Sequence, residues 1–481
     1  MKASAYNFAL PTSENSWLLF NARTGSMMDL TGPDSHALAQ SLTGQDHEDE
    51  IAVDSRSLEL LTAQEFVLED FFDELAAIQR MHWEARRNAP VVVTITTTLD
   101  CNLGCFYCYE ERSPDSLDAR DNPLILRSIA GLLEGSSRRS LHVDWYGGEP
   151  TLNLPFLEQA SRAIQDFCST LGVRYSASII SNGTAWPEDV EEFIERHRIR
   201  QAQITFDGLR ENHNHRRRFT RKDDRERSSF DEAATLVSRL VHVCRVDIRY
   251  NVDNRNQADF IPFVEFALAQ GWFHAKIRAT FQPARVAAYT EKSRFVERIG
   301  LPDDEFHRLK KRASSLLPPE AMEEPETPSG YAAPKTSVCA ALSNNAIVIG
   351  ADRRTYRCGL QVSEIQRSVG TLDRETFRIL NNESSTTDER WWAEFDPTQL
   401  ATCSVCSFLP ICMGGCPKKQ LEKDTGALDA QSLYWRQHLP RLICKTANIP
   451  EVEWQFTERD QFRLASPSPT TVPLEPATAL I

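Results

Sequence analysis

The sequence has no long hydrophobic run. None of its apolar stretches approaches the about 18 to 20 residues that cross a bilayer as a helix. The first residues, MKASAYNFALPTSENSW, also lack the basic start and apolar core of a secretion signal. These absences exclude the membrane-spanning and secreted classes. We therefore expect a cytoplasmic protein, in which cysteine thiols stay reduced.

The sequence also lacks an excess of positive charge. Its formal net charge is -14, which argues against a non-specific nucleic-acid binder or a protein of anionic membrane surfaces, because both must neutralise phosphate. A basic partner is compatible with this charge. The local exception is residues 213–227, HNHRRRFTRKDDRER, where cations and anions interleave as they do in a solvated loop.

The composition is that of an ordinary globular chain. Hydrophobic residues make up 41% and charged residues 25% of the 481 residues. A chain of this length has room for about two to four domains, each with a core of its own.

Residues 90–317 alternate between two hydrophobic periods. Runs of strand period occupy 91–98, 141–147, 176–182, 201–207, 245–252 and 275–281. Helical patterns separate them at 123–134, 153–171, 187–197, 229–242 and 257–270. Strands that alternate with helices predict parallel βα units, so we expect an α/β domain here.

A cysteine-rich loop follows the first predicted strand. In TLDCNLGCFYCYEE, residues 98–111, Cys101, Cys105 and Cys108 stand at C-x3-C-x2-C spacing. Three thiolates on one loop can hold three irons of a [4Fe-4S] cube and leave the fourth iron for a small molecule with an amine and a carboxylate. The alternatives are ordinary buried thiols or a zinc site, but zinc needs a fourth Cys or His, and none follows within the loop.

This loop closely resembles the signature of the radical S-adenosylmethionine (SAM) superfamily. The resemblance implies a partial (β/α)6 barrel, a [4Fe-4S] cluster that binds SAM, and Tyr107 lying against the adenine. In parallel barrels the chemistry lies at the C-terminal ends of the strands, where the further motifs of this chain also fall.

One of these further motifs resembles a SAM-binding segment of the superfamily, and two others follow the next predicted strands. Gly147, Gly148 and Glu149 in WYGGEP match the GGE motif that receives the SAM amino group, and two glycines let backbone approach a ligand closely. Ser181 in SNG is suited to a ribose contact, although a simple turn hydroxyl is the alternative. Asp207 in TFDG can face the cavity or cap the next helix.

An arginine is expected to bind the SAM carboxylate. The segment GLRENHNHRR resembles the part of the family that delivers this arginine. Arg217 fits the position best, and Arg216 is the near alternative. A guanidinium recognises a carboxylate through two parallel hydrogen bonds.

A second cysteine module lies near the C-terminus. CSVCSFLPICMGGC contributes four cysteines at C-x2-C-x5-C-x3-C, with two before and one after: Cys339, Cys358, Cys403, Cys406, Cys412, Cys416 and Cys444. This order resembles the SPASM domain, which holds two auxiliary iron–sulfur clusters. A zinc ribbon fits the four-cysteine run superficially but leaves three cysteines unexplained.

The resemblance also implies which cysteines share a cluster. Auxiliary cluster II takes Cys403, Cys406, Cys412 and Cys444, and cluster I takes Cys339, Cys358 and Cys416. Cluster I then lacks a fourth cysteine, because Cys168 and Cys244 fall in helix and strand patterns and read as buried thiols. Either a non-cysteine group completes cluster I, or one of its irons has no protein ligand. Arg353 stands where the family pattern has glycine.

The remaining segments complete the predicted domain order. Residues 1–89 show a hairpin around Asn21–Gly25, then helical patterns at 35–42, 58–61 and 70–86 with an acidic loop, GQDHEDE, between them. They resemble a leader-peptide recognition element; a cap on the next domain is the alternative. Residues 318–336 read as a linker before a SPASM domain at 337–463, and 464–481 as a disordered tail.

The resemblance implies a 5′-deoxyadenosyl radical that takes hydrogen from a precursor peptide or protein, with an electron donor of flavodoxin or ferredoxin type. Thioether or carbon–carbon cross-linking of a ribosomally made peptide is the expected reaction. Anaerobic sulfatase maturases, which make formylglycine, carry an aspartate base where this chain has Gly359. A non-catalytic iron–sulfur electron-transfer or assembly protein is the remaining alternative. The general base and the catalytic residues are not identified by these motifs.

Overall fold

The computed structural model divides the chain into two compact units. It describes residues 1–13, 15–43, 53–275, 279–322, 332–375, 378–380, 385–450, 454–456 and 462–464. Unit 1 comprises Met1–Trp83, Glu326–Thr336 and Asp396–Ile481, and unit 2 comprises Glu84–Pro325 and Ser337–Phe395. The predicted acidic loop, part of the linker and the tail beyond Leu464 lie outside the described residues.

A mostly parallel sheet forms the centre of unit 2. Six strands pair in parallel and in chain order: β6 (Val91–Thr96), β7 (Ser140–Tyr146), β8 (Arg174–Ser181), β9 (Ile199–Phe206), β10 (Arg245–Val252) and β11 (Ala279–Arg285). The expectation of an α/β fold built from parallel βα units is therefore confirmed. For the last strand the predicted range was too early, and residues 276–278 lie outside the described part of the chain.

The sheet continues beyond β6 with later residues. β12 (Ala346–Ile349) pairs in parallel with β6, and three antiparallel strands follow, β13 (Arg354–Tyr356), β14 (Gly370–Asp373) and β15 (Arg378–Leu380). Residues 337–395 therefore belong to unit 2, whereas residues 396 onward belong to unit 1. The single domain at 337–463 stays a prediction.

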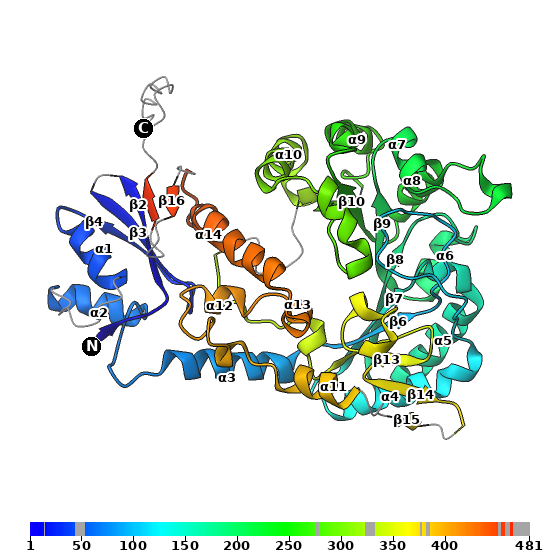
Figure 1. Cartoon of the computed structure of the whole chain (residues 1–481), viewed down its shortest axis with the longest axis horizontal. Coiled ribbons are helices and arrows are strands. Elements are labelled where there is room, and N and C mark those ends of the chain that lie inside the picture. The colour runs from blue at the N-terminus through cyan, green and yellow to red at the C-terminus, as the bar shows by residue number, and fades with distance from the viewer. Residues whose placement is uncertain are drawn as a thin grey trace. The chain divides into compact units, whose positions relative to one another are not determined.

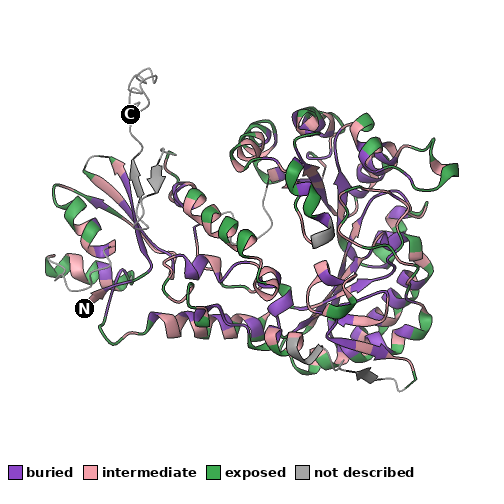
Figure 2. Ribbon diagram, viewed as in Figure 1, coloured by how far each residue is buried: buried purple, intermediate pink, exposed green. Residues whose placement is uncertain are grey.

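Helices cover one face of this sheet (Figure 1). They are α4 (Asn122–Glu134), α5 (Leu154–Thr170), α6 (Val190–Arg196), α8 (Ser229–Leu240), α9 (Phe260–Ala269) and α10 (Asp303–Leu316). Alternate strand residues such as Val93, Val143 and Ile179 are buried in the main core. Figure 2 shows buried segments along the strands of this sheet. A short helix that the sequence did not predict, α7 (Arg210–Arg216), follows β9.

The opposite face of the sheet is polar. Ser178 Oγ donates to Asp144 Oδ1 at 2.5 Å, and Thr94 Oγ1 lies 3.4 Å from the other oxygen of the same carboxylate. Thr280 Oγ1 donates to Asp247 Oδ1 at 2.6 Å. Because successive side chains of a strand point to opposite faces, each strand has an apolar face covered by helices and a polar face with hydrogen bonds. In parallel βα folds, ligands bind at the C-terminal ends of such strands.

Unit 1 is built on an antiparallel sheet of β2 (Asn7–Ser13), β3 (Ser16–Asn21) and β4 (Met27–Thr31). The predicted hairpin around Asn21–Gly25 is confirmed, and α1 (Ser35–Thr43), α2 (Ser55–Ala63) and α3 (Glu74–Asn88) occupy the predicted helical stretches. Phe8 and Phe20 of the sheet share a core with Phe408 and with Leu439 of α14 (Thr425–Ala447). The two ends of the chain thus fold together in this unit.

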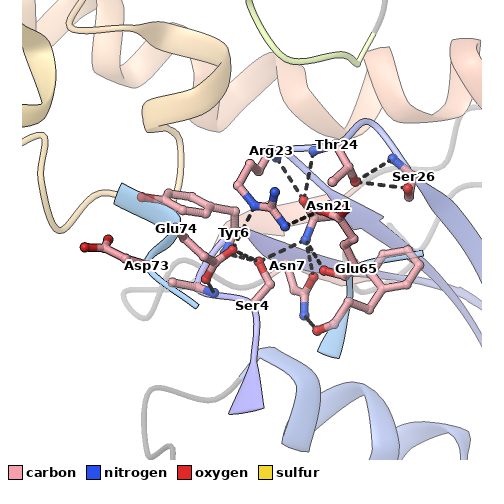
Figure 3. A network of polar contacts seen from close by, with 12 residues as sticks. Ser4, Tyr6, Asn7, Asn21, Arg23, Thr24, Ser26, Glu65, Asp73 and Glu74 are labelled. Atoms are coloured by element: carbon pink, nitrogen blue, oxygen red, sulfur yellow. Dashed lines mark hydrogen bonds and ion pairs between the residues drawn. The ribbon is translucent and has the colours of Figure 1, made fainter. Parts of the chain in front are cut away.

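A buried asparagine fixes the hairpin turn. Asn21 Oδ1 accepts hydrogen bonds from the backbone N–H groups of Arg23 and Thr24 at 2.9 and 3.0 Å, and its Nδ2 donates to Ser4 Oγ and Asn7 Oδ1 at 2.9 Å each (Figure 3). Asn21 is fully buried, and its side chain is the acceptor for the backbone N–H groups of Arg23 and Thr24 at the turn.

Replacing Asn21 with alanine is expected to destabilise unit 1. The Asn21→Ala variant leaves buried donors and acceptors without partners, which costs about 1–3 kcal/mol. Hydrogen exchange of the β3 amides measures this as a lower opening free energy. The exposed Asn15 provides the matched control, because Asn15→Ala removes no side-chain hydrogen bond of the described residues. Equal exchange in both variants would contradict the role of Asn21.

A buried histidine makes the stability of unit 2 dependent on pH. His197 is fully buried, its ring lies 4.8 Å from that of Phe193, and neither ring nitrogen has a hydrogen-bond partner among the described residues. Burial, together with the nearby charges of Arg196 and Arg162, lowers the pKa of His197 to about 4. The folded state therefore favours the neutral ring.

Acid should destabilise the wild-type chain through His197. Its unfolded pKa is about 6.5, so the stabilisation is complete above that pH and is lost as the pH falls toward 4, by about 3 kcal/mol in total. The His197→Leu variant should lose this part of the pH dependence in urea unfolding of the metal-free chain. His274→Leu, at an exposed position, should keep it. A His197→Leu profile parallel to that of the wild type would refute the assignment.

Candidate functional site: a three-cysteine loop around a cavity

The cysteine loop is held by a segment more than 100 residues later. Leu103 forms an isolated antiparallel bridge with Phe219. Gly104 N–H donates to Arg218 O at 2.7 Å, and Thr220 N–H donates to Asn102 O at 2.9 Å. The segment after α7 is thus paired with the loop. Sequence reasoning missed this pairing, because it interpreted residues 213–227 as a solvated loop.

Two glycines hold the other side of the loop. Gly148 N–H donates to Thr98 O at 3.0 Å, and Glu149 N–H donates to Asp100 O at 2.9 Å. A Cβ on Gly147 would lie 2.3 Å from Thr98 O, and one on Gly148 would lie 2.4 Å from Asp100 O. Gly147 also has φ +147°, in the range that favours glycine. The Gly-Gly pair therefore lets the cysteine loop approach the end of β7.

The three thiols border one cavity of about 370 Å³. Of the predicted site residues, Tyr107, Gly147, Gly148, Ser181 and Arg217 also line it. The structure thus brings together residues that the sequence places at the ends of β6, β7 and β8 and after β9, as expected for a parallel βα fold. Lining residues that the sequence analysis did not single out include Tyr109, Glu110, Tyr146, Asn182, Arg249 and Asn251.

The thiols are protonated in the metal-free chain. Burial raises the pKa of Cys101 to about 12 and that of Cys108 to about 11, and it also raises the pKa of Cys105. In the described part of the chain, no three His, Cys, Asp or Glu side chains are placed to hold a single metal ion.

Glu149 and Ser181 bind each other. Glu149 is fully buried and does not itself line the cavity; its Oε1 accepts from Thr151 Oγ1 at 2.6 Å and Ser181 Oγ at 2.8 Å, and its Oε2 accepts from Asn182 N at 2.6 Å. Burial raises the pKa of Glu149, and these hydrogen bonds oppose the rise. The carboxylate thus ties the end of β7 to the end of β8, and its direct contact with SAM stays a prediction.

Asn182 connects the end of β8 to the cysteine loop. Its Nδ2 donates to Asn102 Oδ1 at 2.8 Å and lies 3.7 Å from Cys101 Sγ. No pattern in the sequence identified Asn182, although it directly follows the predicted Ser181. Its role depends on the approach of β8 to the loop after β6, which only the fold supplies.

The two predicted arginines have different surroundings. Arg217 lines the cavity, and its buried Nε has no hydrogen-bond partner among the described residues. Arg217 Nη1 also lies 3.7 Å from Asp207, whereas Arg216 forms two shorter buried ion pairs, with Asp207 at 3.1 Å and Asp253 at 2.9 Å. An unpartnered guanidinium nitrogen beside the cavity fits a bound carboxylate, so the geometry favours Arg217 over Arg216.

Asp207 is not a lining residue of the cavity, but it contacts the lining residue Tyr107. It is fully buried, and the Tyr107 hydroxyl donates to its Oδ1 at 2.7 Å. Arg217 Nη1 and Asn251 Nδ2 both donate to the same Tyr107 oxygen, at 2.8 and 3.2 Å. Asp207 therefore positions Tyr107 in the cysteine loop. A direct contact between Asp207 and SAM stays a prediction, as does the stacking of Tyr107 on adenine.

Five of the predicted auxiliary cysteines lie in unit 1. Cys403, Cys406 and Cys412 pack around the core that includes Phe8 and Phe408, and Cys444 is buried on α14. Cys416 precedes α13 (Pro417–Glu422). Burial raises the pKa of Cys412 to about 11, with Cys403 and Cys406 adding to the rise.

The four cysteines predicted for auxiliary cluster II thus belong to one unit. The set predicted for cluster I draws on both units, since Cys339 and Cys358 belong to unit 2. Both ligand sets stay predictions. Cys168 and Cys244 are buried in the apolar core of unit 2, which confirms that they are ordinary core thiols.

Residues 95–267 match the sequence profile of the radical SAM superfamily. A comparison with curated proteins finds no match. Among solved structures, the chain is similar to native anSMEcpe with bound AdoMet, with a TM-score of 0.53, 18% identity and coverage of 75% of this chain and 100% of that one. The same protein with AdoMet and Cp18Cys peptide gives a TM-score of 0.52 at 18% identity, with the same coverage.

A third similar structure is that of Streptococcus suis SuiB bound to precursor peptide SuiA. Its TM-score is 0.46 at 14% identity, and the match covers 86% of this chain and 95% of that one. At 18% identity, the similarity to anSMEcpe shows a shared fold. None of the helices in the described residues is long and apolar enough to cross a membrane.

The fold and site define an α/β protein whose parallel strands end at a cavity bordered by three cysteines. The chain contains a radical SAM domain, which begins in β6 and ends in α9. This class implies a [4Fe-4S] cluster and SAM as cofactors. The residues present fit both groups, because three thiols and the unpartnered Arg217 Nε meet at one cavity.

Substituting Gly148 should displace the cysteine loop. In Gly148→Ala the new Cβ overlaps Asp100 O, so the loop must shift and its thiols lose their common geometry. We expect the reconstituted variant to lose iron equivalent to about one four-iron cluster per chain, measured by iron and sulfide analysis.

The matched control is Gly131→Ala in α4, where no heavy atom lies within 4 Å of the added Cβ. It should keep the iron content of the wild type. A Gly148→Ala variant with full iron content would show that the loop tolerates the shift.

Proposed function

We propose that this protein is a radical SAM enzyme that cross-links a ribosomally made peptide through a thioether or a carbon–carbon bond. One observation carries the proposal: Cys101, Cys105 and Cys108 line a single cavity at the strand ends together with Arg217, which comes more than 100 residues later in the sequence. In this proposal the three thiolates hold the [4Fe-4S] cluster and Arg217 binds the SAM carboxylate.

When bound, the cluster and SAM supply a 5′-deoxyadenosyl radical that takes hydrogen from an unactivated carbon. The residues of the chain position the reactants. Gly147 and Gly148 present backbone to the SAM amino group, and Tyr107 holds Arg217 through its hydroxyl at 2.8 Å. Glu149 and Ser181 keep the ends of β7 and β8 together, and Ser181 also faces the SAM ribose.

The remaining cysteines serve the second half of the reaction. A substrate radical must lose an electron before it closes a cross-link, and auxiliary clusters on Cys403, Cys406, Cys412 and Cys444, and on Cys339, Cys358 and Cys416, are suited to accept it. Cys403, Cys406, Cys412 and Cys444 belong to one unit, which supports the first of these sets. A flavodoxin or ferredoxin supplies the electron that starts each cycle.

A peptide substrate is supported by the solved relatives. The anSMEcpe structure with a TM-score of 0.52 contains AdoMet together with the Cp18Cys peptide. The cavity of this chain, about 370 Å³, lies within the range of small-molecule sites. Residues 1–89, with their hairpin and helices, then bind the leader of the precursor.

The residues at positions 359 and 360 favour cross-linking over formylglycine formation. Gly359 stands where a sulfatase maturase carries its aspartate base, and the next residue, Leu360, lines the cavity with an apolar side chain. No carboxylate is therefore supplied from this segment. A non-catalytic role is disfavoured because the cavity joins the three thiols with Arg217.

The test is anaerobic reconstitution with iron, sulfide, SAM and a reductant, followed by incubation with the short peptide encoded beside this chain. We expect 5′-deoxyadenosine and a peptide lighter by two hydrogens, located by fragmentation. Replacing Cys101, Cys105 and Cys108 with alanine should abolish both products, since no cluster remains to bind SAM.

Cys168→Ala is the matched control, because Cys168 is a core thiol distant from the proposed ligands in sequence and lies in α5. It should retain both products. Absence of 5′-deoxyadenosine from the wild-type protein would contradict an enzyme of this class. If the enzyme forms formylglycine on a Cys or Ser target, the proposed cross-linking activity is wrong and the enzyme is an oxidising maturase.

A further inference from the structure

The cavity carries more positive than negative charge. Four arginines line it, namely Arg112, Arg217, Arg249 and Arg285, whereas among the described residues Glu110 is the only carboxylate in the lining. A guanidinium withdrawn from bulk water is costly unless an anion accompanies it. The ligands of this cavity are therefore expected to bring negative charge, of which the cluster on the three thiolates and the SAM carboxylate would supply the part beside the cysteine loop.

Two of these arginines are already engaged. Arg285 forms an ion pair with Asp303 at 2.8 Å. Arg217 binds the Tyr107 hydroxyl and is close enough to the cysteine loop to lower the pKa of Cys105. In the proposed function the carboxylate of SAM would lie beside the cluster-binding thiols, where Arg217 is placed.

Arg249 is different, because it has no anionic partner among the described residues. It is half buried on β10, and its one contact in that part of the chain is the hydrogen bond from its Nε to Asn251 Oδ1 at 3.2 Å. Its two terminal nitrogens are left for a ligand. Arg112, which also lines the cavity, is exposed to solvent and needs no such compensation.

Asn251 orients Arg249 toward the cavity. The two residues are two positions apart on one strand, so their side chains stand on the same face of the sheet. Asn251 Nδ2 donates to the Tyr107 hydroxyl at 3.2 Å, which anchors the amide to the cysteine loop. With Nε held by this amide, the two terminal nitrogens of Arg249 form a fork of the shape that binds a carboxylate bidentately.

We propose that Arg249 is a carboxylate-binding site for the peptide substrate, separate from the arginine that binds SAM. The substrate is then a peptide that places an Asp or Glu side chain, or its free C-terminal carboxylate, in the cavity beside the modified residue. This inference rests on the proposed function for the identity of the ligand as a peptide. The existence of a carboxylate-binding site is inferred from the geometry of Arg249 and Asn251 alone.

The experiment uses the reconstituted full-length protein saturated with SAM. Isothermal titration compares two pairs of synthetic probes: N-acetyl-Gly-Asp-Gly-amide with its Asn counterpart, and N-acetyl-Gly-Gly-Gly with its C-terminal amide. In the wild type we expect one acidic probe to bind at least about tenfold more tightly than its neutral counterpart. The preferred pair identifies the side chain or the C-terminus as the source.

Variants assign this preference to Arg249. Arg249→Gln should bind acidic and neutral probes equally while its affinity for SAM stays within about twofold, and Arg249→Lys should restore part of the preference. Arg245→Gln is the matched control, because Arg245 lies on the same strand, is paired with Asp247 and is absent from the cavity lining. It should bind the probes as the wild type does.

Two results would overturn the inference: equal binding of the acidic and neutral probes by the wild type, or a large loss of SAM affinity in Arg249→Gln. The same samples are assayed for 5′-deoxyadenosine. If 5′-deoxyadenosine forms without a preference for acidic probes, the carboxylate site is refuted and the proposed function stands. If acidic probes are preferred but no 5′-deoxyadenosine forms, the proposed function fails and the site stands.

Discussion

The backbone contact between the cysteine loop and the end of β7 is the constraint on which the site depends. Thr98 O and Asp100 O accept hydrogen bonds from Gly148 N and Glu149 N at 3.0 and 2.9 Å, and no side chain fits between these two segments. The bonds fix the first cysteine of the loop against the sheet. Without them, the three thiols would depend on a long loop whose conformational entropy opposes a common geometry.

Buried polar groups extend this order across the strand ends. Glu149 joins β7 to β8, and Asp207 after β9 holds Tyr107 of the cysteine loop and Arg216 of α7. Each carboxylate is fully buried and fully engaged, which makes its removal costly because the donors around it would be left unsatisfied. The polar lining of the cavity is therefore preorganised, because Glu149 and Asp207, which do not line it, hold the lining residues in position.

Unit 1 shows a second use of long-range packing. Residues near the N-terminus and residues after Asp396 share one core, in which Phe8 lies 4.9 Å from Phe408, ring centre to ring centre. The hairpin and the run from Cys403 to Cys416 therefore fold as one body. If the hairpin binds a leader peptide and the cysteines hold a cluster, both properties belong to the same unit.

The sequence by itself determined the βα order, the three-cysteine loop and the residues that follow the strands, because hydrophobic period and motif spacing are local properties of the chain. It did not predict α7, the pairing of Leu103 with Phe219, or the addition of β12 to the edge of the sheet at β6. Tertiary structure also gives different surroundings to Arg216 and Arg217, which are adjacent in sequence and equally charged. Arg216 pairs with both Asp207 and Asp253, whereas Arg217 lines the cavity and has Asp207 at 3.7 Å, because which carboxylates surround a side chain depends on how distant strands pack.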